Sequence, residues 1–188
     1  MKLKTLVLAF LLIIVTGISV GTLAYFTAED TAHNVITTGG VTIDLIEHTR
    51  DDEGSLIPWP EEGVSGVMPG EDVAKIITVK NTGASAAWVR VKLTKVVTFE
   101  DKTETDTDKM ITYEANTADW TEKDGWYYYN KVLKAGETTE ALIEAVQFST
   151  EMGNDYQNGV ASLNVSAQAV QYDNNGKTVM DAAGWPIG

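Results

Sequence analysis

The chain has 188 residues, with 27 acidic and 14 basic side chains for a net charge of −13, and it contains no cysteine. Such an acidic surface repels nucleic-acid phosphates and anionic lipid headgroups, so neither is an expected partner. The lack of cysteine excludes disulfides and a lipid on an N-terminal cysteine, so stability has to come from a core or from assembly with other chains.

The first 24 residues have the features of an export signal. Two lysines precede the apolar run Leu6–Val15, and no charge occurs between residues 5 and 28. Thr22 and Ala24 place small side chains three residues and one residue before a cut, as a signal peptidase requires. We therefore expect cleavage between Ala24 and Tyr25, and a secreted or cell-surface product.

An uncleaved membrane anchor is the alternative for this segment. The uncharged span is long enough to cross a bilayer, which takes about 20 residues. Gly17, Ser19 and Gly21 weaken the second half of such a helix, and the small residues before Tyr25 fit a cleavage site. Cleavage is therefore the preferred interpretation.

Residues 25–40 are predicted to form an extended arm. The segment is polar, with Tyr25, Phe26, Val35 and Ile36 as its large apolar side chains, and it ends at two glycines. Threonine and valine fit a strand, and the two glycines mark a boundary. Residues 41–188 then form the remaining domain.

Alternating apolar and polar residues predict seven or eight strands after the arm, with no helical period beyond a single turn at Thr178–Ala183. The expected strands are Val41–Leu45, Val73–Lys80, Ala86–Phe99, Met110–Tyr113, Gly125–Leu133, Ala141–Phe148 and Val160–Tyr172. Residues 50–66 are expected to be a loop. The pattern predicts an all-β, antiparallel sandwich of Greek-key or jelly-roll type.

Turn residues separate these strands. Met68-Pro69-Gly70-Glu71 and Asn81-Thr82-Gly83 are turn sequences, because proline presets one corner and glycine permits another. The second turn joins Val73–Lys80 to Ala86–Phe99, which predicts that these two strands form a hairpin. In Ala86–Phe99 one set of alternate residues is mostly apolar and is expected to face the core: Val89, Val91, Leu93, Val97 and Phe99.

No catalytic constellation is visible in the sequence. The two histidines, His33 and His48, belong to no His-Glu-x-x-His zinc motif, and no Gly-x-Ser-x-Gly elbow occurs. The acidic stretch Glu100–Asp108 is interpreted as a solvated loop in preference to a cation site. Asp173–Gly176 has part of a calcium-loop pattern but is interpreted as a turn, so no cofactor is expected and calcium is a weak alternative.

Four aromatic residues follow one another at Trp126–Tyr129. They fit a strand covered on both faces, or a strand with one exposed face that contacts glycan or protein. The second possibility would make the protein a monomeric surface-binding module. Packing of the rings in the core is the preferred interpretation.

Short motifs along the whole chain carry a resemblance to a known family. They are the junction Leu23–Thr27, the turns in Val67–Glu71 and Val79–Gly83, and Ala167–Gln171 near the end. With the export signal, they make the chain similar to the TasA/camelysin family of Gram-positive exported proteins, whose signals are removed by a dedicated SipW-type signal peptidase.

The resemblance implies a jelly-roll subunit of biofilm matrix fibres. In fibre-forming relatives the freed N-terminal arm of one subunit adds a strand to the next, so the implied donor strand here contains Tyr25, Phe26, Val35 and Ile36. Its partners would be further copies of the chain, the signal peptidase, and minor matrix or anchoring proteins. Camelysin itself is classed as a metalloprotease, so protease activity, for which His33 and His48 are the candidate residues, is a further alternative.

Overall fold

The computed structural model describes residues 26–29, 34–37, 40–99, 103–105, 109–153, 156 and 158–186. The expected signal peptide of residues 1–24, its helix, and Tyr25 lie outside the described residues. Most of the acidic stretch Glu100–Asp108 also lies outside them, apart from a short strand at Thr103–Thr105.

The described chain is all-β, as predicted, with a 3-10 turn at Val179–Asp181 in the place where a single helical turn was expected. The strands are β1 (Phe26–Glu29), β2 (Asn34–Thr37), β3 (Ile43–Arg50), β4 (Leu56–Pro58), β5 (Val64–Val67), β6 (Asp72–Ala74), β7 (Ile76–Asn81), β8 (Ala87–Thr98), β9 (Thr103–Thr105), β10 (Ile111–Thr112), β11 (Trp120–Lys123), β12 (Trp126–Tyr129), β13 (Ala145–Phe148) and β14 (Val160–Gln171).

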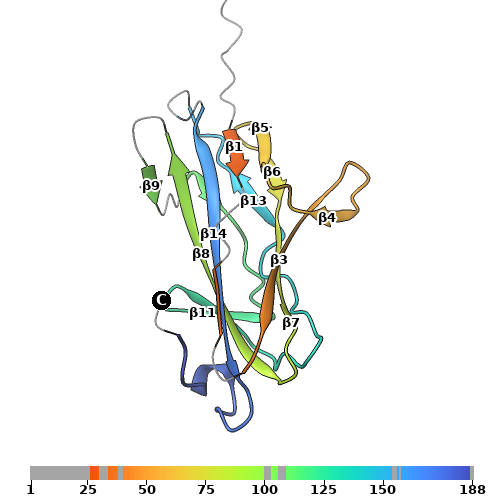
Figure 1. Cartoon of the computed structure of the whole chain (residues 1–188). Helices are drawn as coiled ribbons and strands as arrows, with labels where there is room; N and C mark the ends of the chain where they lie inside the picture. Colours follow the sequence, from red (N-terminus) through yellow and green to blue (C-terminus); the bar gives the residue numbers. More distant parts are fainter. Residues whose placement is uncertain are drawn as a thin grey trace, which may run out of the picture.

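The larger sheet is built on β8 and β14. These strands pair antiparallel along their whole lengths, from Val160 opposite Thr98 to Gln171 opposite Ala87. The strand order is β11-β12-β8-β14-β1-β5, with β2 also paired to β14 and β9 to β8. Figure 1 shows β8 and β14 side by side as the longest strands of this layer.

The second layer contains two three-stranded antiparallel sheets, β4-β3-β7 and β10-β13-β6. Backbone hydrogen bonds connect them, because the Lys75 N–H donates to the Glu144 carbonyl (3.0 Å) and the Leu142 N–H donates to the Ile77 carbonyl (2.8 Å). The chain from 72 to 81 is therefore accompanied by β3 on one side and by the segment leading into β13 on the other (Figure 1).

The main core lies between these layers. The odd-numbered residues of β8 and β14 are buried there, apart from the half-buried Lys95 and Gln171, as the alternation in the sequence predicts. The core side chains of these strands and of the facing layer are Val89, Val91, Leu93, Val97, Ala161, Leu163, Val165, Ala167, Ala169, Ile77, Val79, Val146 and Phe148. Burial of this apolar surface is the main stabilising contribution, at about 25 cal/mol per Å² removed from water.

The predicted turns occur where expected. Gly70 has φ +85°, a backbone conformation that favours glycine, and the Glu71 N–H donates to the Met68 carbonyl (3.1 Å). Asn81 is fully buried, and its amide donates to the carbonyls of Ser85 (2.8 Å) and Leu133 (2.9 Å). This side chain therefore fixes the turn instead of simply interrupting a strand.

Two expectations about the strands were wrong, and a third, the antiparallel sheets, holds except at the N-terminal arm. The turn at Asn81 does not close a hairpin: β7 pairs with β3 and β8 pairs with β14, so the chain crosses between layers. The expected loop 50–66 contains β4 and β5. The sheets are antiparallel except where β1 and β2 pair parallel with β14.

Candidate functional site

The expected N-terminal arm supplies two strands to the larger sheet. β1 lies between β14 and β5, pairing parallel with β14 (Ala28 with Ala161) and antiparallel with β5 (Ala28 with Val64). Strand β1 is thus an interior strand of the sheet (Figure 1). Without it, β14 and β5 would have no partner strand between them.

The second strand of the arm also pairs with β14. β2 pairs parallel with β14, with Val35 opposite Ala167 and Ile36 opposite Gln168. The Val35 side chain is 38% exposed and Ile36 is half-buried, so this strand is held mainly by backbone pairing. The arm therefore contacts β14 at two separate stretches, near each end of that strand.

The structure places the candidate donor residues as follows. The Phe26 backbone pairs with Val67, while Val35 and Ile36 lie in β2. Tyr25 and the cleavage residues Thr22 and Ala24 fall outside the described residues. The three described donor candidates thus lie in two strands that both pair with β14, and β1 pairs with β5 as well.

The aromatic run in β12 is covered on both faces, in agreement with the preferred interpretation of the sequence. Tyr127 and Tyr129 pack toward the main core, whereas Trp126 and Tyr128 belong to a second apolar cluster on the outer face of the sheet. Trp185 from the C-terminal segment covers that cluster, with its ring 5.8 Å from the Tyr128 ring.

Arg90 is the centre of this outer cluster. Its guanidinium carbon lies 4.2 Å from the ring centre of Trp126 and 4.6 Å from that of Trp185, which is cation–π geometry. The guanidinium also donates two hydrogen bonds to the Gln168 Oε1, at 2.9 and 2.6 Å. The stacking of Trp185 on Arg90 therefore attaches the C-terminal segment to the sheet.

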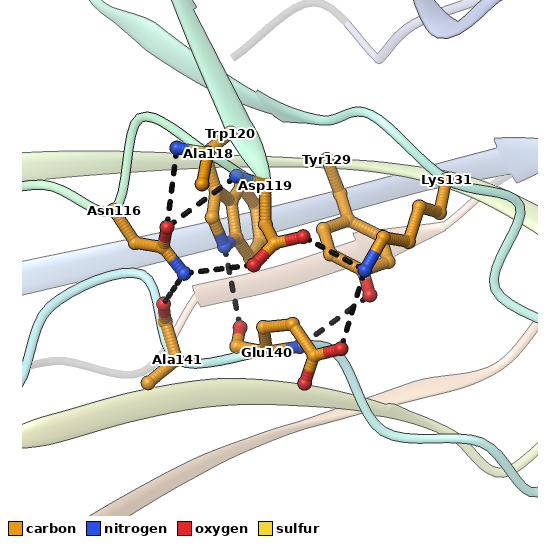
Figure 2. Close-up of polar contacts among 8 residues, drawn as sticks. All are labelled: Asn116, Ala118, Asp119, Trp120, Tyr129, Lys131, Glu140 and Ala141. Atoms are coloured by element: carbon orange, nitrogen blue, oxygen red, sulfur yellow. Dashed lines mark hydrogen bonds and ion pairs between the residues drawn. The ribbon is translucent and has the colours of Figure 1, made fainter.

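A polar network joins β11 and β12 to the segment before β13 (Figure 2). The Lys131 Nζ contacts the Asp119 Oδ1 at 2.7 Å and the Glu140 Oε1 at 3.3 Å. Asn116 donates from its amide to the Asp119 Oδ2 (3.1 Å) and to the Ala141 carbonyl (3.2 Å). These bonds hold three separate chain segments together at one end of the sandwich.

The same contacts shift the pKa values of the groups in this network. Hydrogen bonds from Lys131 and then Asn116 lower the pKa of Asp119 below its ordinary 3.8. Hydrogen bonds to Asp119 and then Glu140 raise the pKa of Lys131, and burial raises the pKa of Tyr129 above 10.0. The lysine and the phenol stay protonated at neutral pH, and the ammonium of Lys131 pairs with the ionised Asp119.

A buried ion pair lies between β3 and the break separating β6 from β7. The Lys75 Nζ is 2.5 Å from the Glu47 Oε2, and the two side chains are 3% and 2% exposed. The ammonium sits 3.7 Å from the ring centre of Trp59, whose own indole N–H is buried with no partner among the described residues. The sequence interpretation missed this pair, although a lysine inside the apolar run Val73–Lys80 was a usable signal.

The two histidines are the remaining candidates for chemistry. His48 lies in β3, and His33 is outside the described residues. The described part of the chain holds no group of three histidine or carboxylate side chains placed to bind a metal ion. Among the same residues no helix has the length and apolar character needed to cross a bilayer.

The protein was also compared with known proteins. No protein-family model, no curated protein and no solved structure matches this chain. The function therefore has to be argued from the arm and from the residues around it.

Proposed function

We propose that this protein is a secreted structural subunit of extracellular matrix fibres, with a jelly-roll fold of the TasA/camelysin type. In a fibre, the N-terminal arm of one subunit would take the place on the next subunit that the arm holds here on its own sheet. The position of β1 between β14 and β5 is the observation that carries the proposal.

The physical reason is that exchanging arms between subunits conserves the backbone hydrogen bonds between the arm and β14. An arm that pairs with β14 in its own chain makes the same backbone hydrogen bonds with β14 of a second copy, so exchange has a small net cost. If each subunit donates its arm forward, the contact does not close and a filament results. An acidic, cysteine-free exported chain gains stability from such assembly without any disulfide.

Export processing would control the exchange. Cleavage after Ala24 by a SipW-type signal peptidase would free the arm from Tyr25 onward. The mature chain would then be secreted and would assemble at the cell surface or in the matrix, with minor matrix or anchoring proteins as further partners.

A disulfide trap tests the exchange. Val35 and Ala167 are register partners across the parallel β2–β14 pair, and the natural chain has no cysteine to compete. The mature double variant Val35→Cys with Ala167→Cys is assembled under reducing conditions and then oxidised. Exchange predicts covalent multimers on non-reducing gels, because each bond joins two subunits.

Oxidation of the monomer before assembly is the matched control for this experiment. It should lock the arm on its own sheet, prevent fibres and leave a covalent monomer, while the single variant Val35→Cys assembles normally. Fibres in which oxidation yields only intramolecular bonds would contradict arm exchange. Failure of the wild-type protein to assemble at all would count against the structural function itself.

A further inference from the structure

The buried pair of Lys75 and Glu47 has a geometry that an ordinary surface ion pair does not have. The ammonium nitrogen and the carboxylate oxygen are 2.5 Å apart, and both side chains are almost completely removed from solvent. The antiparallel register pairs Glu47 with Ile77 and His48 with Ile76. Lys75 is two residues before Ile77, so its side chain is on the same face of the sheet as that of Glu47. The strands therefore hold the two groups together without help from flexible loops.

The surroundings of the pair are apolar. Lys75 and Trp59 line a small internal pocket whose other walls are mostly hydrophobic side chains. These are Val73, Ile111, Val146, Phe148, Ala161 and Leu163, with Ser162 as the polar exception. Such an environment excludes water and makes separated charges costly, so the two side chains stay in contact.

We propose that Lys75 and Glu47 form a modification site, at which the two side chains condense into an intramolecular amide cross-link. One proton moves from the ammonium to the carboxylate, which gives a free amine and a carboxylic acid. The Lys75 Nζ attacks the Glu47 Cδ, the new N–C bond forms, and one C–O bond breaks. The oxygen leaves as water with two protons, so the reaction needs no oxidant, reductant or cofactor.

Two features of the chain support this chemistry. Reacting groups held in contact and shielded from water react as if at very high concentration, roughly 10⁵ M or more in well-oriented cases. The chain also lacks cysteine, so an amide between β3 and the β6–β7 segment would provide the covalent staple that a disulfide would otherwise supply. The inference is independent of the fibre proposal.

Intact-mass spectrometry of the denatured mature protein tests the cross-link. Loss of one water lowers the mass by about 18 Da relative to the sequence. Lys75→Arg and Glu47→Ala each remove one reacting group and should restore the full mass. A full-length mass for the wild-type protein would overturn the proposal, whether or not either variant folds.

Tryptic mapping locates the bond. Amide formation abolishes cleavage after Lys75, so the peptide ending at Arg50 should appear joined to the peptide 51–80. Lys131 is the internal control, because its contact with Asp119 is similarly close but its side chain is 55% exposed, and cleavage after it should be normal. A mass loss with normal cleavage after Lys75 would indicate dehydration elsewhere, such as at Asp124-Gly125, and would also overturn the proposal.

Discussion

At the scale of single residues, charged side chains on this acidic protein differ in how firmly they are held. Asp119 accepts from both Lys131 and Asn116, whereas Asp52 makes no hydrogen bond or ion pair to another described residue. The Asp119 side chain is 20% exposed, and Asp52 is exposed at the surface. Only the first ties separate elements together, so only its charge should influence the stability of the fold.

The lowered pKa of Asp119 gives a pH prediction. The native state holds the proton less readily than the unfolded chain, so the stabilisation by this carboxylate is complete above pH 3.8 and is lost as the pH falls below that value. The variant Asp119→Asn should have a lower melting temperature than wild type at pH 6. The difference should shrink as the pH is lowered toward 3, as measured by circular dichroism.

The matched control for this experiment is Asp52→Asn, which removes the same charge without breaking a contact between described residues. Its melting temperature should follow that of the wild-type protein across the same pH range. An equal, pH-dependent loss in both variants would mean that net charge decides the effect, and not the network around Lys131.

At the scale of elements, the C-terminal segment depends on a few aromatic contacts for its attachment to the sheet. Trp185 packs on Arg90 and Tyr128 and donates its indole N–H to the Ala182 carbonyl (3.1 Å). Trp185→Ala should lower the free energy of unfolding by about 2 kcal/mol, because a half-buried aromatic and a cation–π contact are lost together. Urea denaturation of the full chain measures the change.

Met180 is the comparison within the same segment. Its side chain is 37% exposed, and Met180→Ala should change the free energy of unfolding by less than about 0.5 kcal/mol. Similar losses in both variants would show that the segment contributes through general surface coverage. They would contradict a specific role for the stacking of Trp185 on Arg90.

The long strands of the fold are predictable from the sequence, but their partners are not. The alternation in Ala87–Thr98 and Val160–Gln171 identifies both the strands and their inward faces. The turn at Asn81 suggests a hairpin because turn residues encode a change of direction but not which strand lies next to it. In the structure Asn81 bonds across to Leu133, a contact 52 residues away that no local pattern contains.

At the scale of the whole molecule, the candidate site shows the same limit. The sequence marks an arm through its polar composition and two closing glycines, and it predicts a strand there. It does not show that β14 would receive the arm, or that the pairing would be parallel, because parallel pairing has no sequence signature in a segment of four residues. The partner of Lys75 was likewise hidden, since Glu47 lies 28 residues away.

Assembly of the whole molecule should depend on a free N-terminus. The mature protein starting at Tyr25 is expected to form fibres, whereas a version with extra residues ahead of Tyr25 should remain monomeric, because the extension would have to be accommodated beside the sheet of the next subunit. Electron microscopy and light scattering of both samples measure this directly. Deletion of residues 25–38 should leave a folded monomer that cannot donate a strand, so fibres from that truncated chain would exclude the arm as the donor, and fibres from the extended chain would exclude processing as the control.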